Sequence, residues 1–250
     1  MTAAIAILSA LVDEQRGLLG ALLQPHQTQR AGRTFWSGLL CGVPVVLATS
    51  GIGKVAAAIT STVLIDFFGV SRVIFTGVAG GVGFGVAVGD IVVGSAFVQH
   101  DMDCSPLFPR YELPGYGQSQ IRAHSALSDA LLQSCRFAPL AQAGNALPVT
   151  IHHGLIASGD RFVSRAGEVA HLMAAMATAG QHPLAVDMEC AAVAQVCLAY
   201  DVPFAAVRTI SDRADAQAHG DFQHFVTHVA SQYSHHIVTN LLNALSKQKL

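Results

Sequence analysis

Two carboxylates, Glu189 and Asp212, stand at the borders of apolar segments in a chain of which only 12% is charged. Glu189 begins the run ECAAVAQVCLAY, whose length and all-round hydrophobicity predict a helix packed in the interior. Asp212 follows an apolar run of strand length. A carboxyl group in apolar surroundings has a raised pKa and can serve as a general acid near neutral pH. A charge at a helix start and a capping residue would give the same pattern, so both interpretations stay open here.

Other carboxylates also follow apolar runs of strand length, namely Glu14 with Asp13 beside it, Asp160 and Asp187. In α/β proteins ligands bind outside the carboxyl ends of the strands, so these groups are expected near one another. Cleavage of a glycosidic bond requires two carboxyl groups, because one protonates the leaving group while the other activates water. Phe162, close to Asp160, offers a flat face for an aromatic ring. The residues themselves predict a carboxylate-rich pocket.

The elements that would position these groups alternate between strand and helix along the chain. We expect strands at 4–8, 34–40, 43–49, 71–76, 90–99, 149–157, 184–186 and 204–210. We expect helices at 13–23, 55–68, 121–137, 166–179, 189–200 and 221–246, and loops at 25–33 and 100–117. This alternation predicts one α/β domain over residues 1–250, with three layers (αβα) around a largely parallel central sheet. The hairpin signal around Cys41 and Gly42 makes the expected sheet mixed.

Common nucleotide and metal motifs are absent from the sequence. A phosphate loop would need glycine and a hydroxyl residue where Ala48 and Val55 stand, and no dinucleotide fingerprint follows the first strand. The twelve histidines and five cysteines show no metal-ligand spacing, and no serine lies in a nucleophile elbow. The formal charge of -2, with lysine only at Lys54, Lys247 and Lys249, disfavours nucleic acid as a partner.

The sequence also predicts a location in the cell. No run approaches the roughly 20 apolar residues that a membrane helix needs, so we expect no membrane partner. The apolar N-terminus lacks a basic flank and a cleavage site, and we interpret it as a first strand rather than a signal peptide. The scattered cysteines are typical of core thiols in a reducing compartment. These features predict a cytoplasmic protein.

One long loop, residues 100–117, is rich in proline and carries the aromatic residues Phe108, Tyr111 and Tyr116. Loops of this length and composition often form a lid or contact a second subunit. A surface loop packed by its own side chains would have the same composition, and the sequence does not separate these alternatives.

Eight segments of the chain, taken together and in order, resemble the 5′-methylthioadenosine/S-adenosylhomocysteine nucleosidases of the nucleoside phosphorylase/hydrolase superfamily. These segments are AILSALVDE, SGIGKVAAA, TGVAGG, GDIVVGS, HDMD, GLIASGDRFV, VDMECAAVAQVC and VPFAAVRTISDRAD. The resemblance extends from about Ile5 to Leu245. It implies a mixed sheet with helices on both faces, a homodimer, and hydrolysis of a thio-nucleoside to adenine and a 5-thio-ribose. It also implies that no metal and no organic cofactor is used.

The resemblance implies a role for three catalytic residues. Asp212 corresponds to the acid that protonates N7 of adenine, and Glu14 to the base that holds and deprotonates the attacking water. Arg208 corresponds to a residue near that water.

Further residues correspond to the substrate-binding positions of the family. Glu189 would accept hydrogen bonds from the ribose 2′- and 3′-hydroxyls, and its charge would stabilise a cationic ribose. Met188 would pack on the ribose and Phe162 would stack on adenine. The backbone of Val163 would contact the purine edge. The remaining expected substrate-binding residues are Val78, Ser211 and Ile52.

The chain departs from the family pattern at three places. Val78 stands where the family often has a serine that helps to hold water, and Asp187 replaces the first glutamate of a VEME motif. The loop around Phe108 and Tyr111, which in the family reaches the 5′-substituent pocket of the neighbouring subunit, does not match the commonest family version. The preference among 5′-substituents is therefore left open.

Three other functions compete with the nucleosidase. A purine nucleoside phosphorylase would need cations or converging donors for phosphate, but the Gly-rich segment 76–85 has no lysine or arginine and Glu14 would repel phosphate. An AMP nucleosidase would need a cation for the 5′-phosphate, for which Arg110 is the evident candidate. A non-catalytic nucleoside-binding protein would not need Glu14, Glu189 and Asp212 together.

Overall fold

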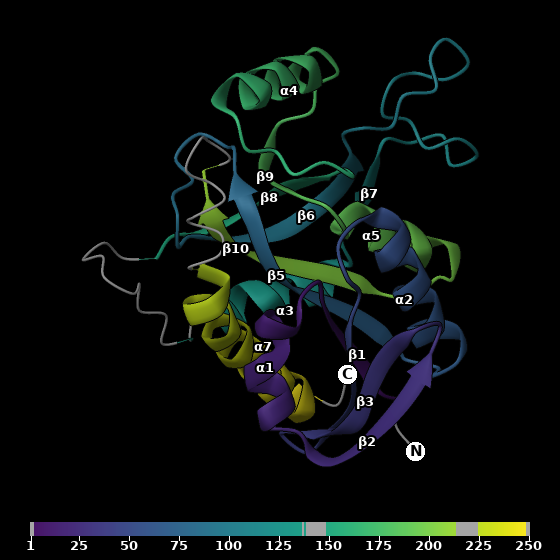
Figure 1. The fold of residues 1–250 in the computed structure, drawn as a ribbon, viewed down its shortest axis with the longest axis vertical. Coiled ribbons are helices and arrows are strands. Elements are labelled where there is room, and N and C mark those ends of the chain that lie inside the picture. Colours follow the sequence, from purple (N-terminus) through teal and green to yellow (C-terminus); the bar gives the residue numbers. More distant parts are fainter. Residues whose placement is uncertain (1–2, 137, 139–148, 214–224, 249–250) are drawn as a thin grey trace.

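The computed structural model describes residues 3–136, 138, 149–213 and 225–248, the last range without the side chains of 227, 228, 247 and 248. The described strands are β1 (Ile5–Ser9), β2 (Leu23–Arg30), β3 (Arg33–Leu40), β4 (Val43–Thr49), β5 (Arg72–Gly81), β6 (Ile91–Gln99), β7 (Gln120–Arg122), β8 (Ile151–Ser158), β9 (Pro183–Asp187) and β10 (Phe204–Asp212). The described helices are α1 (Val12–Gly20), α2 (Lys54–Asp66), α3 (Ser125–Arg136), α4 (Ala166–Thr178), α5 (Cys190–Ala199), the π-helical turn η1 (Val226–Ala230) and α7 (Ser231–Gln248). Figure 1 shows their arrangement.

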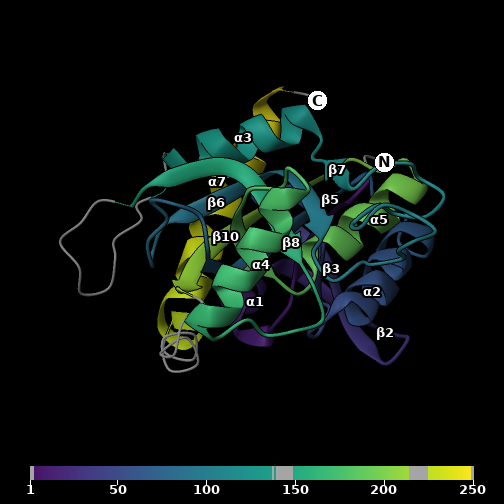
Figure 2. The ribbon, with the colours of Figure 1, turned by 90° about the horizontal axis from the view of Figure 1, so that it is seen from above.

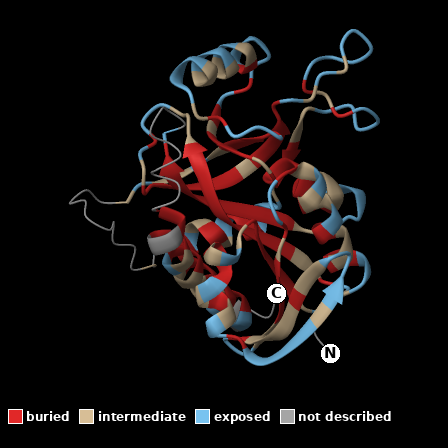
Figure 3. Cartoon of the chain, in the orientation of Figure 1, coloured by how far each residue is buried: buried red, intermediate tan, exposed pale blue. Residues whose placement is uncertain are grey.

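Helices cover both faces of the sheet, as predicted for a three-layer α/β fold. Successive strand residues point to opposite faces. In β1, Ile5 and Ile7 pack in one core cluster with residues of α1, α3 and α7. Ala6 and Leu8 pack in a second core cluster with residues of α2 and α5. The buried strands therefore form the central layer between two helical layers (Figures 1 to 3).

The sheet is mixed, as expected, but it contains a closed part that the sequence did not predict. Five of the ten strand pairings are parallel and five are antiparallel. β5 pairs with β10, β10 with β6, β6 with β8, β8 with β9, and β9 again with β5. These five strands close on themselves, and β1, β4, β3 and β2 extend from β5 as an open sheet.

Two segments form strands where the sequence predicted something else. The segment 25–33, expected as a polar loop, contributes most of β2, an exposed edge strand whose pairing with β3 shifts register between Leu23 and His26, next to Pro25. Edge strands tolerate polar residues and proline because one side of the strand faces solvent. The expected helix 121–137 begins only at Ser125, because β7 pairs with β6 before it.

The ends of other predicted elements differ from the structure or lie outside the described residues. The strand expected at 71–76 continues through the glycines to Gly81, since β10 pairs along most of it. The expected C-terminal helix is present from Phe225 onward, as η1 and α7, while residues 221–224 lie outside the described part. Phe137, the expected end of the third helix, lies outside it too. None of the helices described is long and apolar enough to span a bilayer.

Candidate active site

A cavity of about 320 Å³ lies where the carboxyl ends of β1, β5, β8, β9 and β10 meet. The ends of strands in α/β folds are the usual place for ligands. Nine of the ten predicted site residues line this cavity, namely Glu14, Ile52, Val78, Phe162, Val163, Met188, Glu189, Ser211 and Asp212. The tenth, Arg208, lies beneath it and is 1% exposed. The fold therefore brings together residues from six segments that are distant in the sequence.

The cavity opens where β5 changes its partner. Along one edge, Arg72 to Phe75 pair with β1, and Gly80 and Gly81 pair with β9, while β10 occupies the other edge. Between these pairings the N–H of Val78 donates to Oε1 of Glu14 at 3.0 Å instead of to a strand. The change of partner along β5 thus leaves room for the cavity and frees a backbone N–H donor.

Glu14 is buried and is held by backbone groups alone. Its Oε2 accepts hydrogen bonds from the N–H groups of Ala10 and Leu11, both at 2.8 Å, and its Oε1 accepts the one from Val78. Burial raises the pKa of Glu14, although Arg208 and the three N–H groups oppose the shift. A buried carboxylate with a raised pKa and a fixed orientation has the properties of a general base.

Arg208 lies at the centre of a cluster of carboxylates. Its Nε donates to Oδ2 of Asp187 at 2.9 Å, and its Nη2 lies 2.8 Å from the same oxygen and 3.8 Å from Oε2 of Glu189. Its guanidinium also stacks 4.0 Å from the centre of the Phe75 ring. Pairing is what allows such a charge to stay buried, because an isolated buried cation is very costly.

The Nη1 of Arg208 has no hydrogen-bond partner among the described residues and lies beside Gly77. A Cβ atom at Gly77 would lie 2.6 Å from this Nη1 and 2.8 Å from Oε1 of Glu14. Only glycine therefore lets the guanidinium and the carboxylate approach each other over β5. The two groups converge on the region where Val78 faces the cavity.

Glu189 stands at the start of α5, where the sequence predicted a helix beginning. The N–H of Gly53 donates to its Oε1 at 2.9 Å. Burial, reinforced by the charge of Asp187, raises the pKa of Glu189 to about 7, although Arg208 and Gly53 oppose the shift. Near neutral pH this group therefore exists in both forms, and its ionised form is acceptor-only.

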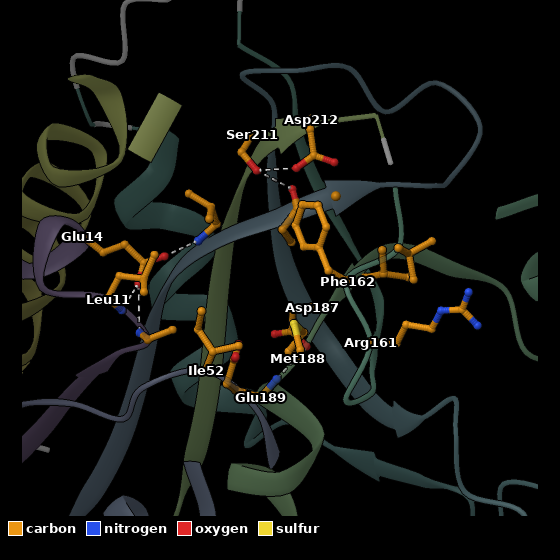
Figure 4. Close-up of a pocket in the computed structure, with 16 residues that line it drawn as sticks. Leu11, Glu14, Ile52, Arg161, Phe162, Asp187, Met188, Glu189, Ser211 and Asp212 are labelled. Carbon is orange, nitrogen blue, oxygen red and sulfur yellow. Dashed lines mark hydrogen bonds between the residues drawn. The ribbon is translucent and has the colours of Figure 1, made fainter. Parts of the chain in front are cut away.

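Asp212 ends β10 beside a register shift between Ile210 and Asp212. A β-bulge of this kind re-aims side chains and is common next to active sites. Ser211, in the bulge, donates to Oδ2 of Asp212 at 2.7 Å. In Figure 4 Asp212 and Glu189 lie at opposite ends of the pocket, and the ring of Phe162 lies close to Asp212. A planar ligand between Asp212 and Phe162 would thus have a carboxyl group on its rim.

The outer part of the pocket is more exposed and more apolar. Ile52 is 58% exposed and Phe162 is 41% exposed. The cation at this rim, Arg161, is exposed and paired with Glu168 of α4 at 2.5 Å. Arg110, the predicted candidate for a phosphate contact, lies 3.6 Å from Asp103 in its own loop.

The loop 100–117 divides into a buried and an exposed part. Tyr111 is fully buried and packs in a core cluster with Ala96 and Val98 of its own chain. The expectation that the loop around Phe108 and Tyr111 lies near a partner's site stays a prediction. Leu107 and Phe108 are exposed, at 82% and 37%.

Asp187 was expected among the strand-end carboxylates but was given no role, since its change from glutamate looked conservative. In the structure its Oδ1 accepts a hydrogen bond from the hydroxyl of Ser158 at 2.5 Å, and its Oδ2 binds Arg208. Backbone N–H groups at the start of α5 also point to it. The indication was Arg208 itself, because an arginine inside a fully buried strand requires a buried carboxylate.

Comparison with known proteins agrees with this geometry. A family model described as the phosphorylase superfamily matches residues 4–243. A 5′-methylthioadenosine/S-adenosylhomocysteine nucleosidase of Haemophilus influenzae (strain 86-028NP) is 35% identical over 243 residues, which are 97% of this chain and 99% of the relative. The chain belongs to this nucleosidase family of the phosphorylase superfamily.

Solved structures of the family share the fold. A nucleosidase of Colwellia psychrerythraea in complex with adenine has a TM-score of 0.88 and 34% identity, over 98% of this chain and 96% of that one. A Neisseria meningitidis nucleosidase in complex with methylthio-immucillin-A has a TM-score of 0.87 and 30% identity, over 98% and 100%. In the described part of this family member, no three His, Cys, Asp or Glu side chains are grouped so as to hold a metal ion.

Proposed function

We propose that the protein hydrolyses the N-glycosidic bond of 5′-methylthioadenosine, S-adenosylhomocysteine or both, giving adenine and the 5-thio-ribose. The observation that carries the proposal is the gathering of Glu14, Glu189 and Asp212 in one apolar-walled cavity beside Phe162. The names of the family relatives support the same substrates. No metal or organic cofactor is needed for this chemistry.

In the proposed mechanism the base leaves as positive charge builds on the ribose. Asp212 donates its proton to N7 of adenine as the bond between C1′ and N9 breaks, so adenine leaves neutral. Glu14 takes a proton from water, whose oxygen bonds to C1′. Arg208 lies near this water, since its Nη1 and Oε1 of Glu14 converge over Gly77. Each proton is thereby moved by a carboxyl group that is already positioned by the fold.

Glu189 and the pocket walls bind the substrate in this scheme. Ionised Glu189 accepts the hydrogen bonds of the two ribose hydroxyls and stabilises the cationic ribose. Met188 packs on the ribose, Phe162 stacks on adenine, and the backbone of Val163 contacts the purine edge. Ile52, Ser211 and Val78 complete the binding residues, and Val78 contributes its N–H to Glu14.

Two features argue against the competing functions. A phosphorylase would bring phosphate to the β5 edge, where buried Glu14 would repel it. An AMP nucleosidase would need a cation for the 5′-phosphate, but Arg161 and Arg110 each already have an acidic partner. The first feature favours water as the nucleophile, and the second favours a 5′-substituent without a phosphate group.

We also propose a homodimer in the cytoplasm that recycles thio-nucleosides in methionine salvage. Exposed apolar residues beside the pocket, Ile52 and Val55 with Leu107 and Phe108 of the loop, offer a surface for a second copy. All five cysteines are free thiols, which fits a reducing compartment.

Product analysis tests the proposed function. Methylthioadenosine, adenosylhomocysteine, inosine and AMP are each incubated with the protein, with and without phosphate. Adenine and free thio-ribose from the thio-nucleosides without phosphate are the expected products. A strict requirement for phosphate, with a sugar 1-phosphate product, would make the protein a phosphorylase. Tight nucleoside binding without turnover would make it a non-catalytic binding protein.

A further inference from the structure

A chain of polar contacts outside the cavity joins the two walls that face each other across it. Ile52 belongs to one wall and Phe162 to the other. Lys54 lies two residues after Ile52 in the sequence, and Asp160 lies two residues before Phe162. We propose that Lys54, Asp101 and Asp160 form a clamp that fixes the spacing of these walls around the ligand. They are positioning residues, and the identity of the ligand as a nucleoside rests on the proposed function.

The clamp is a closed ring of three hydrogen-bonded links. The backbone N–H of Lys54 donates to Oδ1 of Asp160 at 2.7 Å, and the N–H of Asp160 donates to Oδ2 of Asp101 at 2.9 Å. The Nζ of Lys54 closes the ring on Oδ1 of Asp101 at 2.6 Å and also donates to Gln99 at 3.0 Å. Each wall is therefore tied to the loop at Asp101 and to the other wall.

These contacts differ from an ordinary surface ion pair. The side chain of Lys54 is only 18% exposed, and both oxygens of Asp101 are engaged. Although burial opposes the shift, the hydrogen bonds from Lys54 and the Asp160 N–H lower the pKa of Asp101, so they favour its carboxylate form. Charge-assisted hydrogen bonds with both partners held in place are the stronger class.

Asp160 has a second function in the clamp, because it replaces a missing helix cap. Helix α2 begins after Gly53, which provides no capping side chain, and its first turn has no acidic residue. The carboxylate of Asp160 reaches this helix start from the other wall, where an acceptor and a negative charge are both favourable. The position of α2, and with it that of Ile52, therefore depends on the wall that carries Phe162.

The clamp also reaches the carboxylate that would hold the ribose. Gly53, with φ of +98°, donates its N–H to Oε1 of Glu189. A Cβ atom at Gly53 would lie 3.0 Å from Oδ1 of Asp160. The segment from Ile52 to Lys54 thus contacts the cavity, Glu189 and the opposite wall within three residues.

Lys54→Met and Asp101→Asn test the clamp, with Lys54→Arg as the conservative variant. We expect Lys54→Met to raise KM for methylthioadenosine about tenfold or more while kcat changes less than threefold, because the walls bind substrate and the reacting carboxyl groups are untouched. Lys54→Arg should recover most of the affinity. The double variant, Lys54→Met with Asp101→Asn, should resemble Lys54→Met alone, since both substitutions break the same contact between Nζ of Lys54 and Asp101. Arg30→Met, which removes a cation stacked on Phe67 at the opposite end of α2 from Lys54, is the matched control.

The dissociation constant for adenine is measured in parallel, because it does not depend on turnover. A tenfold weaker adenine complex in Lys54→Met supports the clamp even if the wild-type protein proves not to be a nucleosidase. KM and adenine affinity within twofold of wild type in both Lys54→Met and Asp101→Asn would overturn it. An equal effect of Arg30→Met would also overturn the clamp, since the loss of affinity would then reflect the change in net charge. If Lys54→Met does not fold, Asp101→Asn and Lys54→Arg decide the outcome.

Discussion

The floor and the mouth of the pocket are held by different kinds of structure. At the floor, Glu14, Glu189, Arg208 and Asp212 are at most 5% exposed and are attached to strand ends or helix starts. At the mouth, exposed apolar side chains stand on loops that polar contacts join to one another. The floor can fix charges because backbone N–H groups and paired charges replace water there. The mouth contacts these charges through the N–H of Gly53, which donates to Glu189.

Asp212→Asn should give the largest effect, since it changes the floor without changing shape. The variant keeps an acceptor for Ser211 but has no proton to transfer, so kcat should fall by at least about 10²–10⁴-fold. Turnover of methylthioadenosine and thermal unfolding are measured together. Asp13→Asn, at an exposed carboxylate paired with Arg16, is the matched control and should stay near wild type. A normal kcat in Asp212→Asn would remove it from the mechanism.

Glu189→Gln should give the next largest loss, about 10²–10³-fold in kcat/KM, the scale of a lost charge contact in the transition state. In the wild type, kcat/KM should rise with pH through about 7 as Glu189 ionises. Pre-steady-state or steady-state rates between pH 5 and 9 check this. A variant with an unchanged kcat/KM would show that Glu189 does not bind the ribose.

Glu189→Gln, which should lower kcat/KM, should raise the free energy of unfolding. The native pKa of Glu189 lies above its unfolded value of 4.5, so the native state binds more protons between pH 4.5 and 7. The contribution of this group to the free energy of unfolding is therefore lost as pH rises through about 7. Relative to wild type, Glu189→Gln should gain stability between pH 5 and 8, by up to about 3 kcal/mol. Urea unfolding at the two pH values measures the difference, and no change with pH would contradict it.

Phe108→Ala tests whether the mouth is completed by a second copy. If Phe108 contacts a partner's site, KM for thio-nucleosides should rise about tenfold, as expected for losing one apolar contact of 1–3 kcal/mol. Tyr111→Phe is the control in the same loop, because Tyr111 is buried in its own subunit and its hydroxyl has no hydrogen-bond partner among the described residues. Sedimentation gives the oligomeric state. A dimer with unchanged KM in Phe108→Ala would place the loop away from the site.

Val78→Ser should give the smallest effect. A hydroxyl there can donate to Glu14 or to the attacking water, which should raise kcat by no more than about tenfold, since a typical hydrogen bond contributes about 0.5–1.5 kcal/mol. Val78→Ala removes the same methyl groups without adding a donor and should not raise kcat. If both variants gain equally, space rather than hydrogen bonding limits the reaction.

The difference between floor and mouth also explains what the sequence could predict. The carboxylates of the floor lie at the borders of apolar runs, where strand and helix periodicity is strongest, and the cavity brings them together as expected. Asp187 was expected among these carboxylates, but its ion pair with Arg208 was not predicted, because Arg208 comes from another strand and a pairing across the fold leaves no local pattern. The clamp was missed for the same reason.

Some features of the fold were likewise predicted from the sequence and others were not. The alternation of elements and the hairpin of β3 and β4 were predicted correctly. The closure of five strands was not, because it depends on β5 pairing with β9 through only Gly80 and Gly81. The edge strand β2 was missed because its polar side chains face solvent and carry no apolar alternation.

The change of partner along β5 has a consequence for how the protein is made. Glu14, the proposed base, follows β1, whereas Arg208 and Asp212 come from β10, the last of the described strands in the sequence. Non-local strand pairings of this kind form late in folding, and a growing chain emerges with its N-terminal part first. An incomplete chain therefore carries Glu14 without Asp212 or Arg208. Under the proposed mechanism, a chain that has not yet added β10 cannot hydrolyse nucleosides.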